Sequence, residues 1–527
     1  IDPVTGRKLV TNLPILVIDD ESDHGSVDTG EDIVDDFGNP DLEHQPKTIN
    51  RLIRAILHHF ARKAYVGYTA TPFANIFIHE RGETQEHGPD LFPSAFITNL
   101  AAPSNYVGPG RVFGSASSTP EDLPLVRTLS DDEFQPWMPS KSTTSPEMKP
   151  HKNGHRPRWK GEDRVPDSLA EAIRSFVYAC AIRKLRGHGD KHSSMLIHVT
   201  RFTSVQNEVF NQVASYVRDM KGRYTRGIEL ASLEASMREE YEATFLPGMR
   251  GIRDALVEGE TLEDFSWTDI RDVLPDVLSD IRVREINGTA KDALDYAEND
   301  ATGLKVIAIG GDKLARGLTL EGLCTSYFLR TARMYDTLMQ MGRWFGYRDG
   351  YLDVCRLYTS QEMVEWFGHI ADAAEELRQE FDNMVAAGAT PKQFGLRVKS
   401  HSVLTVTSRA KMRNARAMQL TYSGDLLQTI VFPNRKDDIA ANFNAADRFI
   451  SALGPSTDLN HQHFVPDGQK WNGHLWRDVS ALSVISFLRE YRTHAASFRI
   501  MSPLIADFIE EMNKDQELTK WTVALIG

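Results

Sequence analysis

The sequence lacks the features of a membrane protein, a secreted protein or a disulfide-stabilised scaffold. No apolar run approaches the roughly 20 residues that a membrane-spanning helix needs, and the first residues do not form a secretory signal. Only 3 cysteines occur among 527 residues, and none has the paired spacing of a zinc site. We therefore expect buried, reduced thiols in a cytoplasmic protein that has no membrane partner.

Positive charge is also scarce in this chain. It has 60 Lys and Arg residues against 73 Asp and Glu, a net charge of −13, which argues against a protein that coats nucleic acid indiscriminately. Residues 383–424 reverse the balance because they contain no Asp or Glu, and they carry the basic residues Lys392, Arg397, Lys399, Arg409, Lys411, Arg413 and Arg416. We predict that the last four of these contact nucleic-acid phosphates. The alternative is that they pair with acidic helices of the same fold.

Short apolar runs alternate with helical patterns along the chain, which predicts an α/β fold built on parallel sheets. We expect strands at residues 13–19, 195–199, 282–287, 306–309, 325–329 and 352–358. We expect helices at residues 41–63, 169–186, 202–220, 360–387, 479–494 and 503–514. In the first helix Thr48 is a candidate cap, and the apolar stripe consists of Ile49, Leu52, Ile53, Ile56, Leu57 and Phe60.

Changes in composition divide the chain into four parts. Residues 1–115 form a first sheet domain, and the Ser-, Thr- and Pro-rich residues 116–165 form a linker or surface insertion. Residues 166–360 form a second sheet domain with a helical insertion at about 226–280, and residues 361–527 form a mixed α+β region. Because the chain begins with Ile1 rather than Met, we expect a piece of a longer protein with a truncated first domain.

The first predicted strand runs into four residues that carry three carboxylates, Asp20-Glu21-Ser22-Asp23. Acidic residues at the carboxyl end of a buried strand lie where open α/β sheets bind ligands. One carboxylate could hold Mg²⁺ and the next could orient a water that attacks a nucleotide γ-phosphate. The alternative is a solvated turn.

Two later stretches resemble parts of the same kind of site. A strand that begins at Tyr65 ends in Thr69-Ala70-Thr71-Pro72, whose hydroxyls could connect a nucleotide site to a neighbouring domain or could form a plain turn. Residues 306–348 read as strand, Gly-rich turn with Arg316-Gly317, strand, helix with Gln340, and a turn with Arg343 and Arg348. Arginines at such a turn suit a phosphate because the guanidinium is a fixed, permanently charged fork of donors.

Taken in order, these stretches resemble the motif series of superfamily 2 helicases. The wording GYTATPFANIF, GGDKLARGLTLEGL and SYFLRTARMYDTLMQMGRWFGYR resembles the Z1 domain family, which is found in bacterial restriction and phage-defence operons and whose description names an endonuclease. The resemblance covers roughly residues 10–420. It implies two RecA-like domains that bind ATP and Mg²⁺ at their junction, and a motor that acts on DNA, which we expect to be double-stranded, beside a separate nuclease subunit.

The resemblance also assigns roles to individual residues. Asp20 and Glu21 would be the magnesium-coordinating and water-activating carboxylates, and Asp23 would be a cofactor-binding residue beside them. Thr69 and Thr71 would couple the nucleotide site to domain movement. Arg316, Gly317 and Gln340 would face the nucleotide from the second domain. Arg343 or Arg348 would be the finger that stabilises transferring charge. The spacing of the last motif departs from the helicase pattern Q-x-x-G-R-x-x-R, which leaves the choice of arginine open.

The sequence departs from a complete ATPase in one further respect. The phosphate-binding pattern G-x-x-x-x-G-K-[ST] does not occur in residues 1–527. Three hypotheses therefore stand: an ATP-hydrolysing motor, a metal-dependent endonuclease, and a non-catalytic helicase-like scaffold. No nuclease motif is recognisable, and the motor hypothesis accounts for the most motifs.

Overall fold

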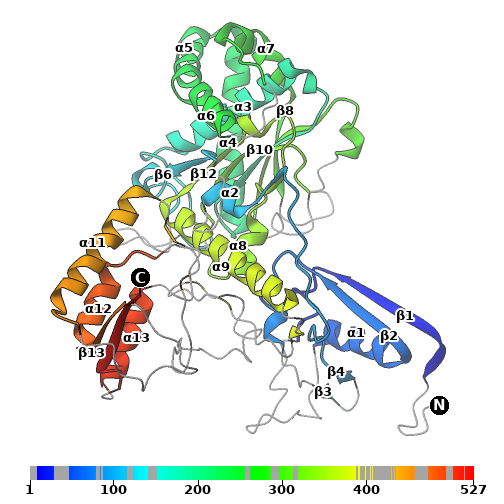
Figure 1. Ribbon diagram of the computed structural model, residues 1–527. Coiled ribbons are helices and arrows are strands. Elements are labelled where there is room, and N and C mark those ends of the chain that lie inside the picture. The colour runs from blue at the N-terminus through cyan, green and yellow to red at the C-terminus, as the bar shows by residue number, and fades with distance from the viewer. Residues whose placement is uncertain are drawn as a thin grey trace. The chain divides into compact units, whose positions relative to one another are not determined.

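The computed structural model places the chain in two compact units, residues 1–415 and 416–527 (Figure 1). The structure describes residues 9–28, 47–78, 83–84, 87–114, 123–139, 151–255, 262–286, 296–311, 319–330, 332–386, 388, 390–391, 398, 404, 406, 429, 432–433, 435–456, 473–493, 502–514 and 517–526. All structural statements below concern these residues.

The first unit is built on a six-stranded sheet in which every pairing is parallel. Its spatial order is β6 (Val126–Leu129), β12 (Arg356–Ser360), β10 (Leu323–Phe328), β7 (Ser193–His198), β9 (Lys305–Gly310) and β8 (Ile281–Ile286). All residues of the three central strands β10, β7 and β9 are buried. This is expected of a parallel sheet that helices cover on both faces, and it confirms the predicted α/β fold.

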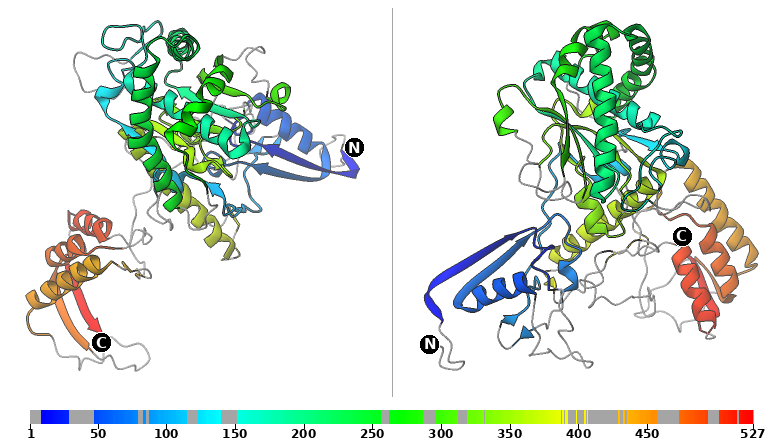
Figure 2. Two further views of the ribbon diagram at one scale, coloured as in Figure 1. Left: turned by 90° about the horizontal axis from the view of Figure 1, so that it is seen from above. Right: turned by 180° about the vertical axis from the view of Figure 1, so that it is seen from behind.

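Helices cover the two faces of this sheet and divide its core into two layers (Figure 2). The first layer packs α3 (Asp167–Arg183), α4 (Thr203–Arg226) and α7 (Trp267–Asp280) against alternate strand residues such as Ile307 and Ile309. The second packs α8 (Tyr335–Met341) and α9 (Gln361–Ala386) against the residues between them, such as Ala308. The alternation follows from the two-residue period of a strand. Helix α3 corresponds to the helix predicted at 169–186, and almost all of its residues are buried.

The helical insertion contains α5 (Leu230–Glu240), α6 (Leu246–Asp254) and α7, as its charged helical pattern predicted. Single-turn π-helices follow α3 at Lys184–His188 and α5 at Tyr241–Phe245. The Ser- and Pro-rich segment, expected to be a linker or surface insertion, instead supplies the edge strand β6 and two buried tryptophans, Trp137 and Trp159. Its aromatic residues carry that core contribution, although the average composition is that of a loop.

A second, smaller sheet precedes the large one in sequence. Strands β1 (Val10–Asp20) and β2 (Phe60–Tyr68) pair in parallel, with Val17 opposite Tyr65, and α1 (Thr48–His58) connects them. The N-cap of α1 is Lys47, so Thr48 is the first helical residue and not the cap that we expected.

The remaining elements of the first unit are short. They are Asn75–Phe77, β3 (Glu83–Thr84), β4 (Gly88–Pro89), β5 (Tyr106–Val107), α2 (Pro109–Phe113), Asp131–Glu133, Ala297–Asn299, β11 (Gly346–Tyr347) and Leu352–Val354.

The second unit is a small α+β arrangement. Its elements are α11 (Lys436–Ala452), β13 (Gly473–Ser480), α12 (Ala481–Glu490), α13 (Ser502–Lys514) and β14 (Lys520–Ile526), and the two strands pair antiparallel. Trp476, Ile485 and Ile509 belong to its separate core. Within the described part of the whole chain, no helix combines the length and the apolar character needed to cross a membrane.

Candidate functional site

The acidic turn begins where β1 ends. The amide of His24 donates to the carbonyl of Glu21 at 2.9 Å, and the amide of Ser22 donates to the carbonyl of Tyr68 at 3.1 Å, which fastens the turn to the end of β2. Asp20 and Glu21 are exposed, whereas Asp23 has no exposed surface. The first two carboxylates can therefore meet a ligand, while Asp23 faces the protein.

The carboxylate of Asp23 joins three separate stretches of the chain. Thr69 Oγ1 donates to its Oδ1 at 2.9 Å, and Thr71 Oγ1 donates to its Oδ2 at 3.0 Å. Gln340 Nε2, which comes from the last turn of α8, donates to the same Oδ2 at 3.2 Å and to Thr71 Oγ1 at 3.4 Å. Four residues that the sequence assigned to one site are thus in direct contact, although Gln340 lies 317 positions from Asp23.

The two arginines of the last motif lie in different surroundings. Burial lowers the pKa of the half-buried Arg343, and the carboxylate of Glu21 opposes this shift by electrostatic attraction. Arg348 instead folds back on its own turn, where its guanidinium donates to the carbonyls of Tyr347 at 2.6 Å and of Arg343 and Trp344 at 3.2 Å. In this structure Arg343 is the arginine near the acidic turn, and Arg348 stabilises the turn that carries Arg343.

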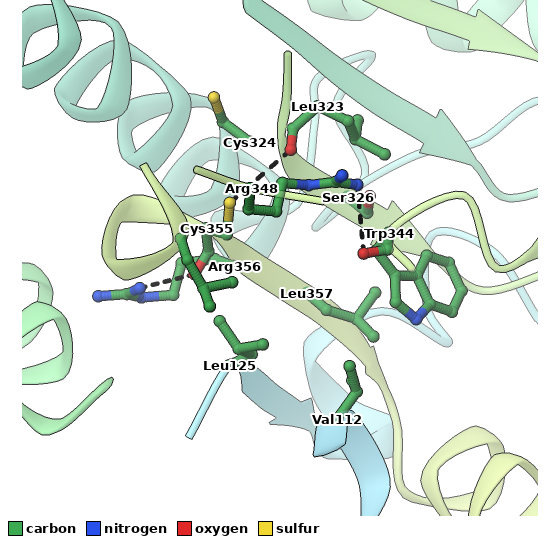
Figure 3. Close-up of a pocket in the computed structure, with 11 residues that line it drawn as sticks. Val112, Leu125, Leu323, Cys324, Ser326, Trp344, Arg348, Cys355, Arg356 and Leu357 are labelled. Carbon is green, nitrogen blue, oxygen red and sulfur yellow. Dashed lines mark hydrogen bonds between the residues drawn. The ribbon is translucent and has the colours of Figure 1, made fainter. Parts of the chain in front are cut away.

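Arg348 also lines a small cavity beside the start of β10 and β12 (Figure 3). The cavity has a volume of about 20 Å³, which is enough for roughly one water molecule and far too small for a nucleotide. The buried Ser326 Oγ and Trp344 Nε1 line it, and within the described part of the chain neither atom has a hydrogen-bond partner. We interpret the cavity as an internal hydration site and not as a ligand site.

The acidic side chains of the turn suit a metal ion that is bound together with a nucleotide. In the described ranges, no group of three or more His, Cys, Asp or Glu side chains is arranged to hold a metal ion. Mg²⁺ bound with a nucleotide needs only one or two protein carboxylates, because phosphates and water supply the other ligands. The exposed, adjacent carboxylates of Asp20 and Glu21 fit that requirement.

Comparison with known families identifies one region of the chain. Residues 168–405 match the model of the Z1 domain family. This Z1 region spans less than half of the chain and contains most of the six-stranded sheet together with Gln340, Arg343 and Arg348. The match confirms the resemblance to the family for that region. No curated protein and no solved structure matches the chain.

Several predicted site residues cannot be placed. Arg316 and Gly317, in the Z1 region, and Arg409, Lys411, Arg413 and Arg416, just beyond it, lie outside the described residues. The basic residues Lys392, Arg397 and Lys399 do as well. The predicted roles of these residues therefore stay predictions. The three cysteines are free and buried, as we expected.

The structure adds residues that sequence reasoning missed, all of them outside the Z1 region. Tyr65 donates to Asp19 Oδ2 at 2.6 Å, and burial together with this carboxylate raises the pKa of the phenol. Asn75 donates to the carbonyl of Ser22 at 3.2 Å, inside the acidic turn. Asn75 belongs to the TATPFAN stretch that carries Thr69 and Thr71, so its position in the motif was a usable signal. The contact of Tyr65 depends on strand register, which the sequence alone does not reveal.

Proposed function

We propose that the chain is an ATP-hydrolysing, helicase-like motor subunit that acts on DNA in a bacterial restriction or phage-defence system. One observation supports this proposal more than any other: the hydrogen bonds that join Asp23 to Thr69, Thr71 and Gln340. The helicase-like motif series predicts that these three stretches meet. The turns after β1 and β2 adjoin because these strands pair in parallel, so the contact of Gln340 carries the most weight.

In this proposal the exposed carboxylates act on the nucleotide. Asp20 would hold Mg²⁺, which when bound would neutralise charge on the phosphate oxygens, and Glu21 would orient the attacking water. Arg343 is the better candidate for the finger, because it lies within electrostatic range of Glu21 whereas Arg348 is engaged by three carbonyls. Gln340 would communicate the state of this site between the two sheets.

The architecture is compatible with two RecA-like lobes. The six-stranded parallel sheet with helices on both faces would be the second lobe, and β1, α1 and β2 would belong to the first. The Z1 match supports a place among restriction and defence proteins, and the predicted basic segment supports DNA as the partner. A separate nuclease subunit is proposed because no nuclease motif is recognisable in the sequence.

One observation favours a second candidate. Residues 1–527 contain no G-x-x-x-x-G-K-[ST] pattern, so the site supplies the magnesium and γ-phosphate side of a nucleotide pocket without a recognisable phosphate loop. A helicase-like scaffold without catalytic activity would have the same sequence feature. The metal-dependent endonuclease stays a third outcome of the test below.

The test is the release of phosphate from ATP by the full-length protein, with and without double-stranded DNA. Glu21→Gln is the diagnostic variant, and Glu229→Gln is the matched control, since Glu229 is also exposed and also has a positive φ, of 52° against 55°. We expect DNA-stimulated release that Glu21→Gln reduces by orders of magnitude and Glu229→Gln preserves. Metal-dependent nicking without ATP hydrolysis would favour the endonuclease, and neither activity without nucleotide binding would favour the scaffold.

A further inference from the structure

We infer that Asn75 and Gly67 are positioning residues that hold Glu21 in a left-handed backbone conformation and so present its carboxylate beside that of Asp20. The inference deepens the proposed ATPase site and rests on that function for its catalytic consequence. Its geometric part stands independently, because it concerns the shape of the acidic turn itself.

Glu21 has a backbone conformation that side-chain-bearing residues rarely adopt. Its φ is 55°, which places it in the left-handed region that favours glycine. Such a residue persists only where the surrounding structure fixes it, and these residues concentrate at functional sites. The turn therefore needs partners that hold it.

The left-handed residue changes which side chains face outward. Along β1 the burial alternates, with Ile18 exposed, Asp19 half-buried and Asp20 exposed. A continued strand would place residue 21 on the half-buried side with Asp19, because strand side chains alternate between faces. Glu21 is exposed instead, next to Asp20, and Ser22 and Asp23 turn inward. Two adjacent carboxylates on one exposed edge are a consequence of this single backbone change.

Asn75 holds the inward-turning part of the chain. Its Nδ2 donates to the carbonyl of Ser22 at 3.2 Å and approaches Ser22 Oγ at 3.4 Å. Ser22 is buried, and its amide is bound to the carbonyl of Tyr68. The residue that follows Glu21 is therefore held on both its amide and its carbonyl side.

Gly67 supplies the space into which Ser22 turns. A Cβ atom at position 67 would lie 2.7 Å from Ser22 Oγ and 2.9 Å from Ser22 Cβ, closer than such atoms approach in proteins. Gly67 pairs with Asp19 in the register of β1 and β2, so this close approach occurs directly beside the turn. Any side chain at position 67 would push Ser22 outward and release Glu21.

The experiment compares Asn75→Ala and Gly67→Ala in the full-length protein with two matched controls. Asn442→Ala removes an amide–carbonyl hydrogen bond of similar kind, to Arg492 at 2.8 Å, together with the bond from the amide of Arg492 to Asn442 Oδ1 at 2.7 Å. Gly222→Ala adds a Cβ with nothing within 4 Å. The readouts are hydrogen exchange of the Ser22 and His24 amides, the thermal midpoint, kcat and KM for ATP, and the Mg²⁺ concentration for half-maximal rate.

We expect both diagnostic variants to speed exchange of these two amides by at least about tenfold with little change in thermal midpoint. We also expect kcat to fall by about 10²-fold while KM for ATP stays similar, because a displacement of about 1 Å is enough for that loss. The half-maximal Mg²⁺ concentration should rise, and the controls should leave the exchange of these two amides, kcat, KM and the Mg²⁺ dependence unchanged.

Unchanged exchange in both variants would overturn the inference, whatever the activity. Faster exchange with unchanged kcat and Mg²⁺ dependence would show a held turn without catalytic importance and would overturn the positioning role. Faster exchange in a protein whose unmodified form does not hydrolyse ATP would support the held turn and overturn the proposed ATPase instead.

Discussion

The two parallel sheets of the first unit differ in how their faces are covered. In the six-stranded sheet, Ile307 and its neighbours in β9 have essentially no exposed surface. In the two-stranded sheet, Leu16 and Ile18 of β1 are 58% and 63% exposed. Parallel sheets are normally buried on both faces, so the first sheet obeys the rule and the second does not. The difference shows that burial organises the large sheet and that polar contacts organise the end of the small one.

Helix α1, which connects the two strands of the small sheet, also buries polar residues and exposes apolar ones. Its apolar residues Ile49, Leu52 and Ile56 are about half exposed or more, whereas Asn50 and Arg54 are buried. Asn50 Nδ2 donates to the carbonyl of Ser26 at 2.8 Å, and Arg54 lies 3.9 Å from Asp90 and donates to the carbonyl of Gly88. The polar face of α1 thus contacts the turn after β1 and strand β4, whereas Ile49, Leu52 and Ile56 on its apolar face are exposed.

The largest expected effect is at Arg343, the arginine of the Z1 region whose pKa is influenced by Glu21 of the acidic turn. Arg343→Ala should lower the rate of ATP hydrolysis by about 10³, equivalent to about 4 kcal/mol, because in the proposed site it removes the charge that stabilises the transferring phosphoryl group. Arg348→Ala is the comparison variant and should act mainly on the thermal midpoint, since Arg348 binds carbonyls of its own turn. Single-turnover kinetics separates the two. An equal loss of rate in both variants would contradict the assignment of Arg343.

The second-largest effect is expected for a substitution in the core of the six-stranded sheet. Ile307→Ala should lower the free energy of unfolding by about 3 kcal/mol, because it leaves a cavity at a position with no exposed surface. Urea denaturation followed by tryptophan fluorescence measures this change. A loss below about 1 kcal/mol would mean that the core around β9 relaxes around the cavity.

A smaller effect is expected where hydrogen bonds organise the small sheet. Asp23→Ala leaves the buried hydroxyl of Thr71 and the hydroxyl of Thr69 without their acceptor, at a cost of about 1–3 kcal/mol. Hydrogen exchange should report this loss as local opening of residues 60–71 before the large sheet opens. Opening of both sheets together would show that the two regions unfold as one unit.

The smallest effect is expected for an isoleucine-to-alanine substitution like that at Ile307, but on the exposed face of β1. Ile18→Ala should change the free energy of unfolding by no more than about 0.5 kcal/mol, because Ile18 is already 63% exposed to solvent in the folded protein. The same urea titration measures it. A loss comparable to that of Ile307→Ala would show that this face is covered in solution.

The sequence predicted the large sheet well because burial leaves a local signature. Residues 306–309 are a continuous apolar run and residues 325–329 end in Tyr-Phe-Leu, and they became β9 and β10 with shifts of one or two residues. The helix at 360–387 is confirmed for the same reason, whereas the strand at 13–19 is confirmed although Leu16 and Ile18 are exposed. In the large sheet and in the helix at 360–387, the predicted apolar faces are covered by neighbouring elements.

Periodicity could not report which face a neighbour covers. The stripe of α1 was recognised, but its burial depends on whether another layer lies against it, and here Asn50 is the buried residue. Nor could spacing decide between Arg343 and Arg348, because the direction of a long side chain depends on the carbonyls within its reach. The composition of the sequence revealed the acidic turn. The left-handed conformation of Glu21 and the hydrogen bond from Asn75 could be recognised only in the three-dimensional structure.

The contact between Gln340 and Asp23 has a consequence for the order of folding. The ribosome makes Asp20 and Glu21 more than 300 residues before it makes Gln340, given the 317-position separation. Contacts of such high sequence separation form late, because the chain between them must first become compact. Asp23 is therefore made early, and its hydrogen bond to Gln340 can form only once α8 has been made. A nascent or truncated chain that ends before residue 340 would carry the acidic residues without this hydrogen bond, so the proposed site would be complete only in a chain that extends past α8.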